Sequence, residues 1–127
     1  MMIKDVKDCR EITAGDGSSL RELLHPGRTP FAGRYSLAHA RVKPREATKP
    51  HRLRNSEVYW ILEGRGIMRV DGESAVVGLG QIVSIPPRAV QSIENTGDND
   101  LVFLCIVDPA WEPEDEEVLP GPAPRKR

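Results

Sequence analysis

The sequence predicts an all-β fold, either a small barrel or a sandwich, from three observations. Apolar and polar residues alternate over short stretches, which is typical of half-buried strands. Turn signals built from glycine, proline and aspartate recur roughly every 8–12 residues. No stretch has the apolar period of a long amphipathic helix. Since the chain has 127 residues, it is long enough for one domain with one hydrophobic core.

The first predicted strands precede any residue with obvious chemistry. Residues 11–14 and 19–24 read as two short strands, joined by the turn signal Gly15-Asp16-Gly17. Residues 35–42 alternate strongly and form a third. One face of this third strand carries only small or β-branched side chains, those of Ser36, Ala38, Ala40 and Val42. Such a face is expected to pack inside a narrow barrel.

Two later stretches carry polar side chains inside an apolar pattern. The first, residues 51–66, reads HRLRNSEVYWILEGRG. Alternation places Glu57, Tyr59 and Ile61 on one face and Trp60 on the other. The second, residues 80–95, reads GQIVSIPPRAVQSIEN and is interrupted by two prolines. The two stretches together predict a site in the mouth of a small barrel.

The remaining strands follow from turn and burial signals. Residues 67–70 and 74–77 flank Asp71-Gly72, a strong hairpin signal. Residues 101–107 are a continuous apolar run with the length of a buried strand. The domain is therefore expected to span residues 1–111, with its core motifs at 45–95. Residues 112–127 are acidic and proline-rich and are expected to form a flexible tail.

Composition and charge argue against several classes of protein. A net charge of −1 gives no electrostatic reason to bind nucleic acid or an anionic membrane. No apolar run reaches the ~18 residues of a membrane-spanning helix, and the N-terminus lacks the apolar region of a signal peptide. Cys9 and Cys105 are the only cysteines and belong to no CxxC motif. A cytoplasmic protein is expected.

The two polar stretches resemble the motifs of the cupin family. The first cupin motif, G-x5-H-x-H-x3/4-E-x6-G, is matched by His51, Glu57 and Gly64. The second, G-x5-P-x-G-x2-H-x3-N, is matched at its first glycine, its proline and its asparagine, which are Gly80, Pro86 and Asn95. Both motifs stand in order with one hairpin between them. The resemblance implies a small double-stranded β-helix barrel of the cupin, jelly-roll-like type.

The departures from these motifs bear on the metal site that the resemblance implies. In a typical cupin, three histidines and one glutamate converge on manganese, iron, nickel, copper or zinc. Here Leu53 replaces the second histidine of the first motif, and Gln91 replaces the histidine of the second motif. A divalent metal held by His51, Glu57 and Gln91 is one interpretation. The other is a degenerate pocket in which these side chains only form hydrogen bonds.

Further candidate residues surround this group. Tyr59 shares the face of Glu57, so His51, Glu57 and Tyr59 could form a metal-free acid–base set, as in sugar epimerases of the cupin superfamily. Alternatively, Tyr59 is a wall residue with a satisfied hydroxyl. Arg45 and Arg88 stand at two of the four motif glycine positions, and they are either solvated loop residues or rim residues that bind an anionic substrate. Cys105 is expected to be a small core residue, or a soft ligand if it points inward.

Two histidines fall outside both motifs. We expect His25 and His39 to lie at the surface or in an interface, and Trp60 to face away from the site. A homodimer is expected as well, because a short open barrel has edges to cover and cupins commonly pair through their sheets.

These observations support three functional hypotheses. The first is a cupin that binds a small polar or anionic metabolite, over a divalent metal if the reduced ligand set suffices. Resemblance to mannose-6-phosphate-isomerase-like or dioxygenase-like cupins makes an enzyme plausible. The second hypothesis is a non-catalytic ligand-sensing or storage module. The third is a metal-free sugar isomerase or epimerase that uses His51, Glu57 and Tyr59.

Overall fold

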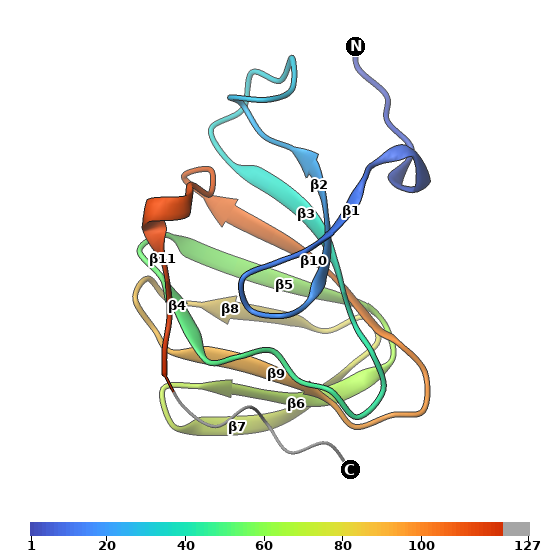
Figure 1. Cartoon of the computed structure of the whole chain (residues 1–127), viewed down its shortest axis with the longest axis vertical. Helices are drawn as coiled ribbons and strands as arrows, with labels where there is room; N and C mark the ends of the chain where they lie inside the picture. Colours follow the sequence, from blue (N-terminus) through green and yellow to red (C-terminus); the bar gives the residue numbers. More distant parts are fainter. Residues whose placement is uncertain (121–127) are drawn as a thin grey trace.

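The computed structural model describes residues 1–120 and contains two antiparallel β-sheets (Figure 1). The first sheet has the order β1 (Glu11–Thr13), β2 (Ser19–Leu24), β3 (Ser36–Val42), β10 (Leu101–Asp108), β5 (Ser56–Glu63) and β8 (Ile82–Ile85). The second has the order β11 (Glu116–Val118), β4 (His51–Leu53), β9 (Gln91–Asn95), β6 (Arg65–Val70) and β7 (Glu73–Gly78). The only helices in this part of the chain are two 3-10 turns, η1 (Val6–Asp8) and η2 (Pro113–Asp115), and neither could cross a bilayer. The all-β prediction is confirmed.

The predicted alternation decides which side chains enter the core. In β5, Glu57, Tyr59 and Ile61 are buried, whereas Trp60 between them is 46% exposed. β5 lies between β8 and β10 in the first sheet, and its inward side chains Tyr59 and Ile61 belong to the hydrophobic core. The small face of β3 also points inward, and Ala40 is only 1% exposed. The inner faces of both sheets thus form one core that includes Ile61, Ile93, Leu101 and Phe103.

The hairpin predicted at Asp71-Gly72 joins β6 to β7. Both turn residues have positive φ, 48° and 86°, as the two central residues of a type I′ turn require. The pairing Val70↔Glu73 closes the turn, and Met68↔Ala75 continues the ladder.

The acidic segment that follows residue 111 differs from the expected flexible tail. Strand β11 pairs with β4 through Glu116↔Leu53 and Val118↔His51, which fastens the segment to the second sheet. The Trp111 indole also donates a hydrogen bond of 2.9 Å to the Glu116 carboxylate. Composition could not reveal the pairing with β4, because it joins the acidic segment to residues that are far away in the sequence. The last part of the predicted tail, residues 121–127, lies outside the described residues.

The expectation that His25 lies at the surface or in an interface is wrong. This side chain is 2% exposed. Its Nδ1 accepts a hydrogen bond from the Gly27 amide at 3.0 Å, which leaves Nε2 to donate to the Trp111 carbonyl at 2.8 Å. His25 is therefore a buried bridge between the end of β2 and the segment that leads into η2. His39 is partly buried on β3, beside Arg21 of β2 and Leu104 of β10.

Arg45 and Arg88 occupy two of the four motif glycine positions, and both have left-handed backbones. Their φ angles are 68° and 69°. A residue with a Cβ is disfavoured in this region by about 1–2 kcal/mol, and glycine is not. The turns at these positions therefore require the conformation that glycine adopts most easily, and this chain forms them with arginine.

Replacing Arg88 by glycine should raise the stability of the protein. The substitution removes the strain of the left-handed backbone, which raises the free energy of unfolding. Glycine also increases the entropy of the unfolded state, which lowers the free energy of unfolding by about 0.5–1 kcal/mol. We expect a net gain of up to about 1 kcal/mol in urea unfolding. Arg54→Gly is the matched control, because Arg54 is exposed and is not among the positive-φ residues. A loss of stability in both variants would contradict this explanation.

Candidate functional site

A cavity of about 680 Å³ opens between the sheets. Strands β3, β4, β5 and β10 provide walls with their inward faces, and β1 and β2 add to them. The N-terminal segment before β1 and the C-terminal segment after β10 also contribute to the lining. His51, Glu57, Tyr59 and Cys105 all line it. Two distant parts of the sequence thus bring the main predicted site residues to a single hollow.

His51 begins β4 and is 4% exposed. Its Nδ1 lies 2.9 Å from the Lys49 carbonyl oxygen, which can only accept, so Nδ1 carries the proton. In the neutral ring Nε2 then holds the lone pair. Nε2 lies 3.8 Å from the nearest carboxylate oxygen of Asp16, which is beyond hydrogen-bond distance. His51 can therefore accept a proton or a hydrogen bond at Nε2.

Glu57 lies in β5 and is 6% exposed. One of its carboxyl oxygens accepts a hydrogen bond of 2.8 Å from the Gln91 side-chain amide. The pKa of Glu57 is raised to about 8, because burial, helped by the nearby charges of Asp16 and Glu116, outweighs the lowering effect of the Gln91 hydrogen bond. A carboxyl group with this pKa is mostly protonated at neutral pH and can donate a hydrogen bond or a proton.

Gln91 begins β9 and pairs with His51 across the second sheet. Its NH₂ group is used on Glu57, and its buried oxygen Oε1 has no hydrogen-bond partner within residues 1–120. Gln91 is not one of the residues that line the cavity. Gln91 therefore holds the Glu57 carboxyl group in position through this hydrogen bond and does not itself line the cavity.

Asp16 and Glu116 reach the same cavity and were missed by the sequence analysis. Asp16 belongs to the Gly15-Asp16-Gly17 stretch, which was read only as a turn. Its Oδ1 accepts from the amide and the hydroxyl of Ser18, at 3.0 and 2.7 Å. Its own carbonyl accepts from the Lys49 amide at 2.8 Å, which ties this turn to the loop before His51. Glu116 arrives through β11, in the segment that was expected to be flexible.

Tyr59 and Cys105 form part of the cavity wall. They are paired across β5 and β10, and the Tyr59 ring packs on Phe103 with ring centres 4.5 Å apart. Burial raises the pKa of both groups well above the usual range. The Tyr59 hydroxyl has no hydrogen-bond partner among the described side chains and backbone groups, so it can bond to a ligand.

Arg45 and Arg88 are not brought to this cavity. The Arg45 guanidinium is exposed and lies 2.8 Å from Asp98. Arg88 is exposed and lines a different depression beside Arg52, Arg54 and Glu117. The structure thus separates the two arginines from His51 and Glu57.

The residues present do not fit a resident metal ion. Within residues 1–120, no three His, Cys, Asp or Glu side chains converge closely enough to hold one. The typical ligands left from the motifs are one imidazole and one carboxyl group, and Leu53 stands where the family has another histidine. The Gln91 amide turns its NH₂ group, which cannot bind a metal, toward Glu57. Ligand number and type both fall short of a first-row metal site.

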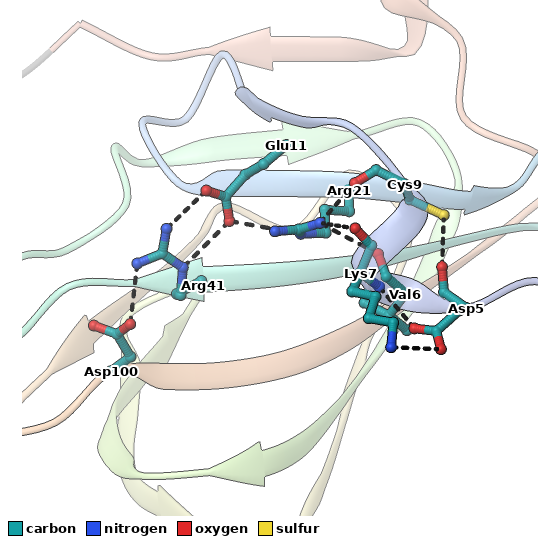
Figure 2. Close-up of polar contacts among 8 residues, drawn as sticks. All are labelled: Asp5, Val6, Lys7, Cys9, Glu11, Arg21, Arg41 and Asp100. Carbon is teal, nitrogen blue, oxygen red and sulfur yellow. Dashed lines mark hydrogen bonds and ion pairs between the residues drawn. The ribbon is translucent and has the colours of Figure 1, made fainter.

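An N-terminal arm, residues 1–13, covers one side of the cavity. Figure 2 shows Arg21 of β2 reaching back to the arm, where it donates to the carbonyls of Val6, Lys7 and Cys9 at 3.3, 3.3 and 2.7 Å. Arg41 of β3 binds both Glu11 in β1 and Asp100 before β10, at 2.8 and 3.0 Å (Figure 2). The arm contributes Cys9 and Ile12 to the cavity lining.

Comparison with known proteins agrees with this architecture. Residues 38–107 match the model of the cupin domain. An uncharacterized protein, MJ1618, of Methanocaldococcus jannaschii is 43% identical over 106 residues, which cover 82% of this chain and 83% of that protein. An oxalate-binding protein of Thermotoga maritima is 35% identical over 51 residues, which cover 40% of this chain and 42% of the relative.

A solved structure shows the same fold over nearly the whole chain. The polyketide cyclase RemF of Streptomyces resistomycificus superimposes with a TM-score of 0.79 at 22% identity, and the match covers 98% of this chain and 89% of that one. At this identity the likeness concerns the fold alone. The domain match, the 43% identical relative and the two-sheet barrel with its central cavity show that this chain belongs to the cupin family.

Proposed function

We propose that this cupin binds a small organic molecule in the barrel cavity, with His51 and Glu57 as the polar groups that orient it. The observation that carries the proposal is the placement of these two buried side chains in a single cavity of about 680 Å³. This volume falls within the range of small-molecule sites, which bury most of the ligand and fix it with a few polar groups.

The two side chains also form a donor and acceptor pair suited to proton transfer. His51 presents Nε2 as an acceptor, because Nδ1–H is held by Lys49. Glu57 in its neutral form presents a proton. A substrate with an acidic C–H beside a carbonyl could lose its proton to Nε2 while Glu57 donates to the carbonyl oxygen, with Tyr59 as an additional hydrogen-bond donor. Return of the proton from Nε2 to a different carbon, with a hydroxyl of the enol or enediol giving a proton back to Glu57, would complete a metal-free isomerase reaction, and return to the opposite face of the same carbon would complete an epimerase reaction.

Two other functions stay open predictions. A sensing or storage module would use the same contacts and show no turnover, and the name of the oxalate-binding relative makes oxalate one ligand to test. The metal interpretation, a manganese, iron, nickel, copper or zinc ion at His51, Glu57 and Gln91, has one observation in its support, the unpaired buried oxygen of Gln91, against the short ligand set described above. A cytoplasmic location is also part of the proposal, and both cysteines are free thiols, as a reducing compartment allows.

The proposed partner is a second copy of the chain. On the outer face of the first sheet, Leu104, Trp60 and Ile82 stand side by side across β10, β5 and β8. Trp60 and Ile82 are 46% and 65% exposed, and β8 is the edge strand of this sheet. Exposed apolar side chains next to a free strand edge favour association.

Trp60→Glu is expected to convert the proposed dimer to monomers. A charge in the centre of an apolar contact is left without a partner, which costs several kcal/mol per dimer. Light scattering after size-exclusion chromatography measures the mass. Val76→Glu is the control, because Val76 is 75% exposed on β7 of the other sheet. A monomeric wild type, or dissociation by the Val76 variant instead, would contradict this interface.

Metal analysis and ligand screening together test the proposed function. Protein purified without chelator or His tag is analysed for metals, and then screened by thermal shift against hydroxyketones, sugars, phenols and oxalate. We expect less than about 0.1 equivalent of metal, and one or more ligands whose stabilising effect is lost in His51→Ala and Glu57→Ala. About one equivalent of metal that disappears in both variants would establish the metal alternative. No stabilisation by any compound would overturn the binding proposal.

A further inference from the structure

The walls of the cavity are mainly apolar, although the sequence suggested a polar or anionic ligand. Side chains from five strands provide these walls, namely Leu20, Ala38, Leu53, Tyr59, Phe103 and Val107. Leu53 stands where the family motif has a histidine, so an apolar side chain takes the place of a polar one in the cavity lining. A ligand that fills this hollow must match apolar surface over most of its own area.

The charged groups at the His51 end of the cavity are acidic. Asp16 and Glu116 line it together with Glu57, and both lie close enough for their charges to raise the pKa of Glu57. A carboxylate or phosphate on the ligand would meet like charges there, at low dielectric and without a cation beside it. The end of the ligand that reaches His51 and Glu57 must therefore be uncharged.

The basic residues of the cavity do not change this conclusion. The Arg28 guanidinium is occupied by two hydrogen bonds of 2.8 Å to the Glu22 carboxylate. The Lys4 ammonium donates to the Leu23 carbonyl at 2.9 Å. Arg10 is exposed and belongs to the N-terminal arm. Arg45 and Arg88, the two arginines expected to bind an anion, lie outside the cavity.

Aromatic side chains make the walls suitable for a ring system. Tyr59 and Phe103 are in tilted contact, with an angle of 32° between the ring planes, and both line the cavity. Trp111 also lines it, and its indole is fixed by the hydrogen bond to Glu116. Rigid aromatic walls favour flat ring ligands through stacking and edge contacts, beyond the effect of buried area alone.

We propose that the ligand is a neutral, mainly apolar ring compound that carries a hydroxyl or carbonyl group. The ring body contacts the apolar walls, and the oxygen points to His51 Nε2 and the Glu57 carboxyl group. A phenolic or enolic hydroxyl donates to Nε2, and a carbonyl accepts from protonated Glu57. This inference rests on the proposed function, because it assumes that the cavity is the ligand site, and it names the class of ligand.

Isothermal titration calorimetry with three probes tests the inference. 2-Naphthol and 2-naphthoate have the same ring system and differ in charge, while malate is a small polar anion. We expect 2-naphthol to bind at least tenfold more tightly than 2-naphthoate and malate to show no measurable binding. The heat-capacity change for 2-naphthol should be negative, because apolar surface is buried.

Two matched variants locate the binding. Ala38→Phe places a ring in the cavity from β3, whereas Ala75→Phe places the same ring on the exposed face of β7. We expect loss of 2-naphthol binding in the first and wild-type affinity in the second. Circular dichroism checks that each variant folds, and Ala38→Leu, with a smaller added volume, replaces Ala38→Phe if the latter does not.

The possible results separate this inference from the proposed function. If 2-naphthoate or malate binds more tightly than 2-naphthol, and the substitution of Ala38 abolishes that binding, the inference is overturned. The proposed function then still stands, because the cavity does bind a ligand. Binding of 2-naphthol that is insensitive to residue 38, or absent, would also overturn the inference. The proposed function falls only if, in addition, no compound in the broader thermal-shift screen stabilises the protein.

Discussion

Glu57→Gln is expected to stabilise the protein increasingly as the pH rises from about 5 to about 8. The pKa of Glu57 is about 8 in the folded protein and 4.5 when unperturbed. Between these values the folded state keeps a proton that the unfolded state loses, so unfolding releases a proton and the wild type becomes less stable with rising pH. Each pH unit in this window costs up to about 1.4 kcal/mol.

The glutamine variant has no proton to lose, and its carbonyl can still accept the hydrogen bond from Gln91. Urea unfolding at pH 5, 6.5 and 8 should therefore show a growing advantage of the variant over the wild type. Glu63→Gln removes a carboxyl group from an exposed position of the same strand, and its pH profile should run parallel to that of the wild type. A difference between Glu57→Gln and wild type that stays constant from pH 5 to 8 would show that Glu57 is not protonated by burial.

Gly64→Ala should be among the most destabilising small substitutions in the barrel. Gly64 has φ +83°, and a Cβ at this position would lie 2.8 Å from the Asp100 carbonyl oxygen and 3.1 Å from the Leu101 Cα. The left-handed backbone costs about 1–2 kcal/mol for alanine, and the overlap with backbone atoms adds about 1–3 kcal/mol. We expect a loss of about 2–5 kcal/mol in urea unfolding.

Gly72→Ala separates the two contributions. Gly72 has nearly the same φ, +86°, but a Cβ there would meet nothing within 4 Å. Its loss should be limited to the backbone cost of about 1–2 kcal/mol. Equal losses in the two variants would mean that the close approach of Gly64 to the start of β10 does not restrict the side chain there.

Local patterns in the sequence were sufficient for much of the fold. Alternation placed Glu57, Tyr59 and Ile61 inward and Trp60 outward, and the structure agrees. The Asp71-Gly72 signal correctly located the β6–β7 hairpin. These features depend on residues that are close in sequence, so propensity and pattern carry the information.

The composition of the site depended on contacts that local patterns do not contain. Asp16 reaches His51 because its turn bonds to Lys49, 33 positions later in the sequence. Glu116 reaches the cavity through the pairing of β11 with β4, in a segment whose composition suggested disorder. Cupin motif positions indicated Arg45 and Arg88 as rim residues, but their left-handed backbones belong to turns outside the cavity.

The central claim is that Glu57 is a neutral carboxyl group in the same cavity as a proton-accepting His51, with no metal between them. Carbon-13 NMR of the glutamate side-chain carboxyls, followed from pH 4 to 10 in metal-free protein, tests it most directly. The signal that disappears in Glu57→Gln is assigned to Glu57. This account predicts that its chemical shift titrates with a midpoint near 8, as burial requires. A midpoint near 4.5 would contradict the account, because Glu57 would then be ionised at neutral pH.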